Sequence, residues 1–272
     1  MNPTLYDVFR ALRNPSVFAM GILTTLLAVV VLALVLSNVA QNSSNLSAAA
    51  TGIGIDVIGG IFGFFVPVIG LVIGNAVYAK DRSTGVMDSV LCRPVTRGEL
   101  VISRFLALVL SSGAILAAAL FVTDLAVVAR TGYFIDPVAL AAIFLSLLVE
   151  AASFGGLIMF LSHVFRSGST VQGASTTIFV IFSIVWYIAL IILVAAENNL
   201  TDAFQTMFIA DYFSPAQYTI LMTAYVQHTF LFGILQINPA NAGLVLGGLV
   251  AGGLAWTLGP FAATYYLATH RD

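Results

Sequence analysis

Residues 80–104 read KDRSTGVMDSVLCRPVTRGELVISR and form a polar island between two long apolar runs. The chain has ten lysine and arginine residues, and charged residues make up only 8% of its 272 residues. Half of those ten lie in this stretch, namely Lys80, Arg82, Arg93, Arg97 and Arg104. A soluble protein carries its charges over its whole surface. Their concentration here predicts a loop at which a membrane domain meets something in water.

Composition places the chain among membrane proteins. Its apolar fraction is 60% and its mean hydropathy is +1.04, against an apolar fraction of about 45–50% in soluble domains. A spanning helix needs about 20 predominantly apolar residues. Six segments meet that need: residues 17–36, 57–79, 105–129, 138–164, 173–196 and 242–268. We therefore expect an all-α membrane protein with six transmembrane helices in one domain, residues 1–272.

The distribution of basic residues predicts the orientation, because lysine and arginine concentrate in cytoplasmic loops. Residues 216–235 are apolar enough to suggest a seventh span, although Gln217, Gln227 and His228 interrupt them. With six spans, only Arg130 lies on the outer side. The inner side then holds Arg10, Arg13, Lys80, Arg82, Arg93, Arg97, Arg104, Arg166 and Arg271. We therefore expect six spans in the cytoplasmic membrane, with both termini in the cytoplasm.

Three segments outside the spans have patterns of their own. In residues 3–13, apolar residues share one helical face and polar residues the other, which predicts an amphipathic helix in the membrane interface. The apolar face holds Leu5, Val8, Phe9 and Leu12, and the polar face holds Thr4, Asp7, Arg10 and Arg13. Residues 37–55 read as a polar loop. Three N-x-[ST] sequons, at Asn42, Asn45 and Asn199, fall in predicted outer loops.

The polar island reads as a helix–turn–helix elbow. Residues 81–87 are expected to continue the second span into water, and Pro94 ends that helix because proline lacks a backbone donor and restricts its predecessor. Thr96 is the expected N-cap of a new helix, with Glu99 three residues later as in a capping box. That helix leads into the third span. On charge alone, the elbow would also suit an anchor on anionic lipid headgroups.

The string from Asp81 to Arg104 resembles the corresponding loop of type-2 ABC-transporter permeases. The matching positions are Asp81, Gly85, Asp88, Leu91, Pro94, Val95, Thr96, Arg97 and Arg104. Asp81 stands where glutamate is usual, Val86 where threonine is usual, and Arg104 where lysine is usual. The resemblance implies that the elbow is a coupling helix, which docks on a separate ATP-binding subunit. It assigns this contact to Asp81, Gly85, Asp88, Leu91, Pro94, Thr96, Arg97 and Glu99.

The same resemblance implies a function and partners. It predicts an exporter subunit that works as a dimer, with a second permease copy of the same or a related chain, bound to two ATPase subunits. ATP and Mg²⁺ would bind to those subunits, so we expect no cofactor, metal or catalytic residue on this chain, and no nucleic acid. An external helical segment between spans five and six would begin at residues 213–218, FSPAQY.

The residues also bear on other classes of function. Lys80 is the only lysine, and the preceding GNAVYAK lacks the glycine and hydroxyl pattern of a phosphate-binding P-loop. Cys92 is the only cysteine, which excludes an internal disulfide. A stand-alone secondary transporter driven by an ion gradient is the alternative, although that class usually has internal repeats. An intramembrane enzyme lacks support, because there is no HExxH motif.

Glu150 is the ionisable residue best placed inside a predicted span, near the middle of the fourth. Such a group is costly in lipid and usually faces the protein interior. It could contact substrate or an ion in a cavity, or it could be a protonated acid bonded to a neighbouring helix, with Ser146 or Ser153 nearby. Asp124 is expected near the outer end of its span, paired or solvated. Gly59 and Gly63 form a G-x-x-x-G pattern, which favours close helix contact.

Overall fold

The structure is a computed structural model that describes residues 3–39, 46–86, 96–165, 167–196, 200–230, 235–236, 239 and 243–270. Six helical runs in this part are long and apolar enough to cross a membrane, which confirms the predicted number of spans. They are Pro15–Leu36, Thr51–Ser83, Arg97–Thr131, Pro137–Val164, Gly168–Ala195 and Leu246–His270. In the described part of the segment considered as a seventh span, the α-helix is only ten residues long.

The elements follow one another along the chain in this order. The first half contains α1 (Pro3–Leu12), α2 (Pro15–Val39), α3 (Leu46–Gly74), the π-helical turn η1 (Asn75–Ala79), α4 (Lys80–Ser83) and α6 (Arg97–Thr131). The second half contains α7 (Pro137–Val164), α8 (Gly168–Val180), the π-helical turn η2 (Ile181–Val185), α9 (Trp186–Ala196), α10 (Leu200–Asp211), the 3₁₀ turn η3 (Pro215–Gln217), α11 (Tyr218–Gln227) and α12 (Leu246–His270). Two-residue strands β1 (Thr229–Phe230) and β2 (Leu235–Gln236) pair antiparallel.

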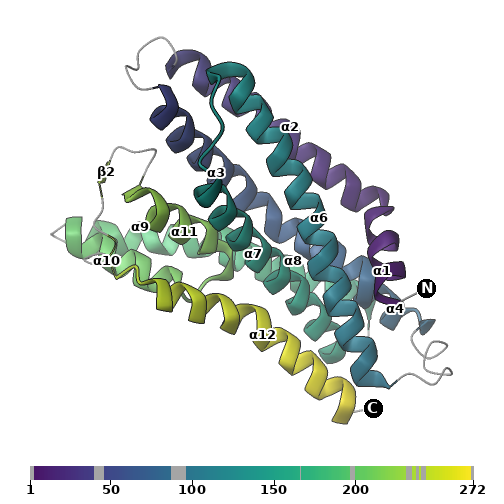
Figure 1. The fold of residues 1–272 in the computed structure, drawn as a ribbon. Helices are drawn as coiled ribbons and strands as arrows, with labels where there is room; N and C mark the ends of the chain where they lie inside the picture. Colours follow the sequence, from purple (N-terminus) through teal and green to yellow (C-terminus); the bar gives the residue numbers. More distant parts are fainter. Residues whose placement is uncertain are drawn as a thin grey trace.

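The long helices form one elongated bundle (Figure 1). Both chain termini lie at one end of it, which we call the terminal end, and α10 lies at the opposite, distal end. Helices α3 and α7 form the centre, and α2, α6, α11 and α12 pack around them. Helices α8 and α9 and most of α12 are exposed, so a large part of their apolar surface is left for lipid or a partner.

Glycines allow the two central helices to approach closely. A Cβ atom on Gly70 would collide with the backbone carbonyl of Ala151, and one on Gly74 would lie 2.8 Å from the carbonyl oxygen of Gly155. Small residues serve this purpose in membrane bundles, because lipid supplies no hydrophobic force between helices and close packing must hold them. The glycine-rich second span is therefore the central helix of the fold.

Two predicted boundaries are corrected. The expected polar loop over residues 37–55 is mostly helical, because α2 extends to Val39 and α3 already begins at Leu46. Its sequence LSAAA explains the early start, since alanine and leucine are strong helix formers and outweigh the neighbouring serine. The helix that continues the second span ends at Ser83 rather than at residue 87.

In the residues that the structure describes between the last two spans, there are two α-helices, α10 and α11. The predicted helix start at residues 213–218 is confirmed: Ser214 has an extended backbone, and Pro215 opens the turn that leads into α11. Helix α10 was not predicted separately. Helix α11 packs against α3 and α7 in the bundle, as well as adjoining α10.

Candidate functional site

The helix α4 stops at a glycine with a left-handed backbone. The backbone N–H of Thr84 donates to the carbonyl of Lys80 at 3.0 Å, and that of Gly85 to the carbonyl of Arg82 at 3.3 Å. Gly85 has φ of 74°, a conformation that glycine adopts without the steric cost that a Cβ brings. The resemblance named Gly85, and the backbone gives this glycine a physical role.

The expected capping box at the start of α6 is confirmed. The N–H of Glu99 donates to Thr96 Oγ1 at 3.2 Å, and the N–H of Thr96 donates to Glu99 Oε2 at 2.9 Å. Arg97 is the first residue of α6, so α4 and α6 hold the two ends of the elbow. Between them, Asp88, Leu91, Cys92 and Pro94 lie outside the described residues.

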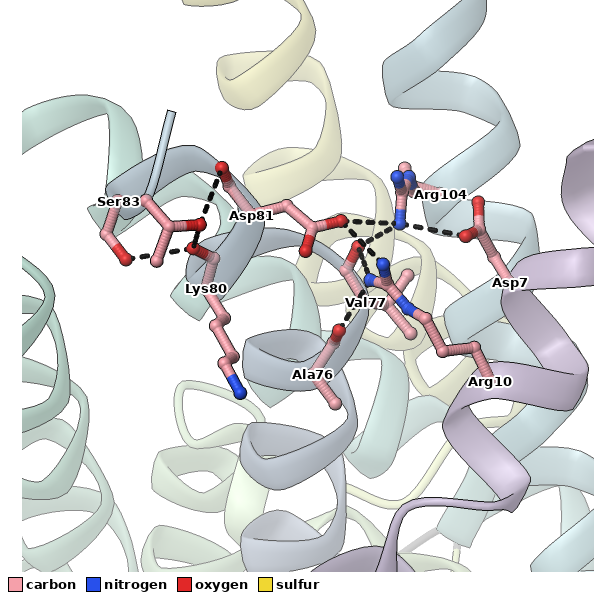
Figure 2. A network of polar contacts seen from close by, with 9 residues as sticks. Asp7, Arg10, Ala76, Val77, Lys80, Asp81, Ser83 and Arg104 are labelled. Carbon is pink, nitrogen blue, oxygen red and sulfur yellow. Dashed lines mark hydrogen bonds and ion pairs between the residues drawn. The ribbon is translucent and has the colours of Figure 1, made fainter. Parts of the chain in front are cut away.

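A cluster of four charged side chains lies where α1, α4 and α6 meet (Figure 2). The Arg104 Nη1 atom is 2.9 Å from Asp7 Oδ1 and 3.1 Å from Asp81 Oδ2, and Arg10 Nη1 is 2.8 Å from the same Asp81 oxygen. Asp7, Asp81 and Arg104 are buried. We call Asp7, Arg10, Asp81 and Arg104 the charge cluster. It joins α1, α4 and α6.

The π-helical turn supplies the remaining partners of both arginines. The N–H of Lys80 donates to the carbonyl of Asn75 instead of that of Ala76, which a regular α-helix would use. The Ala76 carbonyl instead accepts from Arg10 Nη2 at 2.7 Å. The Val77 carbonyl accepts from Arg104 Nη1 at 2.7 Å. The irregular turn thus fixes both guanidinium groups to the end of the second span.

Helix α1 does not turn its polar face toward water, as a simple interfacial helix would. The predicted amphipathic helix is present, but its polar face turns toward the bundle, where Asp7 is buried, and Leu5 and Phe9 are exposed. Burial raises the pKa of the Asp7 carboxyl, although the nearby Arg104 and Arg10 oppose the increase. Sequence reasoning singled out Arg104 and Asp81 but missed their partners on α1. The opposite charges at Asp7 and Arg10, one helical turn apart, were the available signal.

Two further contacts attach this end of the second span to α7. Arg82 Nε donates to the carbonyl of Ser162 at 2.9 Å, and the Tyr78 hydroxyl lies 2.6 Å from His163 Nε2. His163 lies in the last turn of α7. The base of the elbow therefore contacts α1, α6 and α7 through polar groups.

Glu150 occupies a second, separate polar site halfway along α7. Its side chain is fully buried, and Oε1 accepts a hydrogen bond from the backbone N–H of Thr219 at 2.7 Å. Thr219 belongs to the first turn of α11, whose N–H groups have no partner within the helix. Oε2 has no hydrogen-bond partner among the described residues. The carboxyl group thus meets the positive end of α11 in the interior of the bundle.

This arrangement corrects the expected local partners. Ser153 donates to the carbonyl of Val149 in its own helix, and Ser146 to that of Ile143, with Thr219 Oγ1 a further 3.4 Å neighbour of Ser146. The partner of Glu150 is therefore Thr219, which is 69 residues away in the sequence. Sequence reasoning anticipated a bond to a neighbouring helix but gave no signal for which one.

Gly59 and Gly63, the G-x-x-x-G pattern of the second span, face α11. A Cβ atom on Gly59 would lie 2.9 Å from Thr223 Oγ1, and one on Gly63 would lie 3.6 Å from the Cβ of Thr219. The predicted close contact is therefore present, and its partner is α11. Helix α11 is held between a glycine surface on α3 and a carboxyl group on α7.

Asp124 lies near the distal end of α6, as expected. It is buried, and its Oδ1 accepts from the backbone N–H of Ile135 at 3.0 Å. That residue belongs to the short connection to α7. Asp124 therefore supports the turn between two spans.

Comparison with known families agrees with this geometry. The family model described as ABC-2 family transporter protein matches residues 6–272, nearly the whole chain. A search among curated proteins gives no significant match. Membrane subunits of this family lack an ATPase domain and generally pair with ATP-binding subunits. The chain therefore belongs to the ABC-2 transporter family and is a multi-pass membrane permease subunit.

Proposed function

We propose that this permease is the transmembrane subunit of an ATP-driven exporter, in which two permease copies bind two separate ATPase subunits through the elbow. ATP and Mg²⁺ belong to those subunits. The observation that carries the proposal is the charge cluster at the base of the elbow. Asp81 and Arg104 lie at the two ends of the elbow and form an ion pair with each other, and Arg104 also binds Asp7 on α1. A force on the elbow therefore acts on α1, α4 and α6 together.

The charges support an orientation with both termini in the cytoplasm. In the described part of the chain, Arg10, Arg13, Lys80, Arg82 and Arg104 are all near the terminal end, whereas Arg130 lies at the distal end of α6. Basic residues favour the cytoplasmic side. Helices α10 and α11 then belong to the outer half of the protein. The apolar face of α1 suits the inner membrane interface.

The orientation can be tested with single cysteines in a Cys92→Ser background. A cysteine at Tyr133, which is exposed in the α6–α7 connection, should react with a membrane-impermeant reagent applied to intact cells. A cysteine at Ser169 should react only after the cells are opened. The reverse pattern would overturn the orientation and leave the family membership unaffected.

The proposed coupling role is tested by two substitutions in the elbow. Gly85→Val places a β-branched residue at φ of 74° and should displace the elbow. Arg97→Glu reverses a charge where an acidic groove of the ATPase is expected. Neither variant should copurify with the ATPase subunit, and neither should support ATP turnover. Arg130→Glu, at the distal end, is the matched control and should assemble normally.

Two outcomes would contradict the proposal. A purified chain that transports with no ATPase subunit would favour the secondary transporter driven by an ion gradient. If the Arg97→Glu variant binds the ATPase subunit and turns over ATP as well as the unmodified protein does, the elbow is an anchor on anionic headgroups instead. The mass of the purified complex distinguishes a homodimer from a pair of related permeases.

For Glu150, we propose that it acts on transport by positioning α11. Its buried carboxyl and the hydrogen bond to Thr219 support this role over direct contact with a substrate. Glu150→Gln keeps an oxygen acceptor for that N–H. It should therefore leave assembly and ATP turnover nearly unchanged, whereas a direct contact that needs the carboxylate would be lost.

A further inference from the structure

An apolar groove of about 590 Å³ lies between α2 and α6 on the surface of the bundle. Small residues form its floor, with Gly21 and Thr25 from α2 and Ala114 and Ala118 from α6. The Thr25 hydroxyl donates to the carbonyl of Gly21 at 2.8 Å, so it presents no free donor to the groove. Helices α2 and α6 pack side by side (Figure 1). The floor therefore offers apolar contact only.

The dimensions of the groove fit one hydrocarbon chain. Along α2 it extends from Val17 to Val29, a length of about 18 Å at 1.5 Å per residue. That length is close to one leaflet of a hydrocarbon core of about 30 Å. The groove is partly open and its lining is almost entirely apolar, as an acyl chain that lies along two packed helices requires.

One side of the groove is a wall of large side chains. Phe18, Ile22 and Leu26 follow one another at four-residue spacing on α2, and all three are exposed. Val122 stands on the α6 side and is exposed as well. Exposed apolar walls around an apolar floor favour a flexible apolar occupant that is in constant supply in the membrane.

An exposed basic residue directly follows one of the residues that line the groove. Leu12, the last residue of α1, lines the groove, and Arg13 follows it directly and is exposed. Arg10 on the same helix is engaged by Asp81, and Asp7 by Arg104. Among the described residues, no carboxylate forms an ion pair with Arg13. An exposed guanidinium on the residue next to the groove lining is complementary to a lipid phosphate above an acyl chain.

We propose that this groove binds one acyl chain of an anionic phospholipid, whose phosphate is held by Arg13. The lipid would touch Leu12 on the helix that carries Asp7 and Arg10. Its presence would therefore help fix α1 and, through α1, the charge cluster. The binding itself depends neither on the ATPase subunit nor on the orientation of the chain in the membrane.

Native mass spectrometry of the delipidated full chain tests the proposal, with phosphatidylglycerol and phosphatidylcholine as probes. Phosphatidylglycerol should bind about fivefold more tightly, the effect of one basic residue near an anionic lipid. Arg13→Gln should remove this preference and leave phosphatidylcholine binding unchanged. Ala118→Phe, which fills the floor, should weaken both lipids about tenfold, comparable to losing two buried methylenes. Ala114→Ile serves the same purpose if Ala118→Phe does not fold.

The control is Leu110→Phe, at an exposed position of α6 outside the groove, which should bind both lipids normally. A preference for phosphatidylglycerol that survives Arg13→Gln would overturn the headgroup assignment. Equal weakening by Leu110→Phe and Ala118→Phe would overturn the groove. If millimolar glycerol 3-phosphate displaces bound phosphatidylglycerol as well as free phosphatidylglycerol does, the site is one for free anions. If the chain forms a dimer that binds no lipid, the groove belongs to a second copy of the chain.

Discussion

Replacing Glu150 by leucine should release α11 from the bundle. In the protein, Glu150 Oε1 accepts from the Thr219 backbone N–H at 2.7 Å, and the carboxyl group is fully buried. Leucine fills similar space but accepts no hydrogen bond. The Thr219 N–H would then remain unpaired in an interior without water, because it lies in the first turn of α11 and has no partner within the helix.

The magnitude follows from that single unpaired group. A buried backbone donor left without an acceptor costs about 1–3 kcal/mol, which corresponds to about a 5- to 150-fold change in the equilibrium between docked and undocked α11. Glu150→Gln should cost much less, since the amide oxygen still accepts the bond. The two variants therefore separate the need for an acceptor from the need for a charge.

Thiol accessibility measures this equilibrium directly. A cysteine replaces Thr223, which is buried against Gly59, in a Cys92→Ser background. Its labelling rate should rise by the factor above in Glu150→Leu and by less than about threefold in Glu150→Gln. Ser153→Ala is the control, since that hydroxyl bonds only within α7. Labelling of the Glu150→Leu variant at the rate of the parent would refute the idea that Glu150 holds α11.

Three other predictions concern stability in detergent, measured by thermal unfolding. Gly59→Ala should cost about 1–3 kcal/mol, because its new Cβ would lie 2.9 Å from the Thr223 hydroxyl of α11. Gly60→Ala should cost nothing, because no atom lies within 4 Å of its new Cβ. Equal losses of stability would contradict the packing argument. Burial raises the pKa of Asp211 to about 7 from 3.8, so the folded state keeps a proton that the unfolded state loses. Stability should then fall as pH rises from about 4 to 7, by up to about 4 kcal/mol, and Asp211→Asn should flatten this dependence. Arg104→Gln should cost about 3–5 kcal/mol, because it leaves the buried carboxylate of Asp7 without its ion-pair partner. Arg10→Gln removes a partly exposed pair and leaves Asp81 bound to Arg104, so it should cost about 1 kcal/mol. A larger loss for Arg10→Gln would invert the proposed order.

The sequence predicted the spans because lipid imposes one simple requirement on each of them. A helix that crosses the hydrocarbon core must be long and apolar, and that pattern is local. The capping box of Thr96 and Glu99 is local as well, and it was predicted residue for residue. The loop over residues 37–55 was wrong, since its polar residues masked an alanine-rich helix start.

The sites were predicted only in part because their partners are distant in the sequence. Glu150 stood out by its cost in lipid, but nothing near it identified Thr219 as its partner. Likewise, Arg104 stood out at the start of a span, whereas Asp7 looked like one polar residue on the water-facing side of an interfacial helix. The π-helical turn that exposes the carbonyl of Ala76 has no pattern that we could detect in the sequence.

The second span contacts every feature on which the proposed mechanism depends. Near its distal part, Gly59 and Gly63 contact α11, and in its middle Gly70 contacts the backbone of α7. At its terminal end the π-helical turn binds Arg104. These contacts share one nearly continuous helix from Leu46 to Ser83. Because a Cβ atom on Gly70 would collide with the backbone of Ala151, α3 and α7 pack backbone to backbone there, and we expect a displacement at the elbow to move α7 together with α3. Since α7 carries Glu150, this packing provides a physical connection from the elbow to α11.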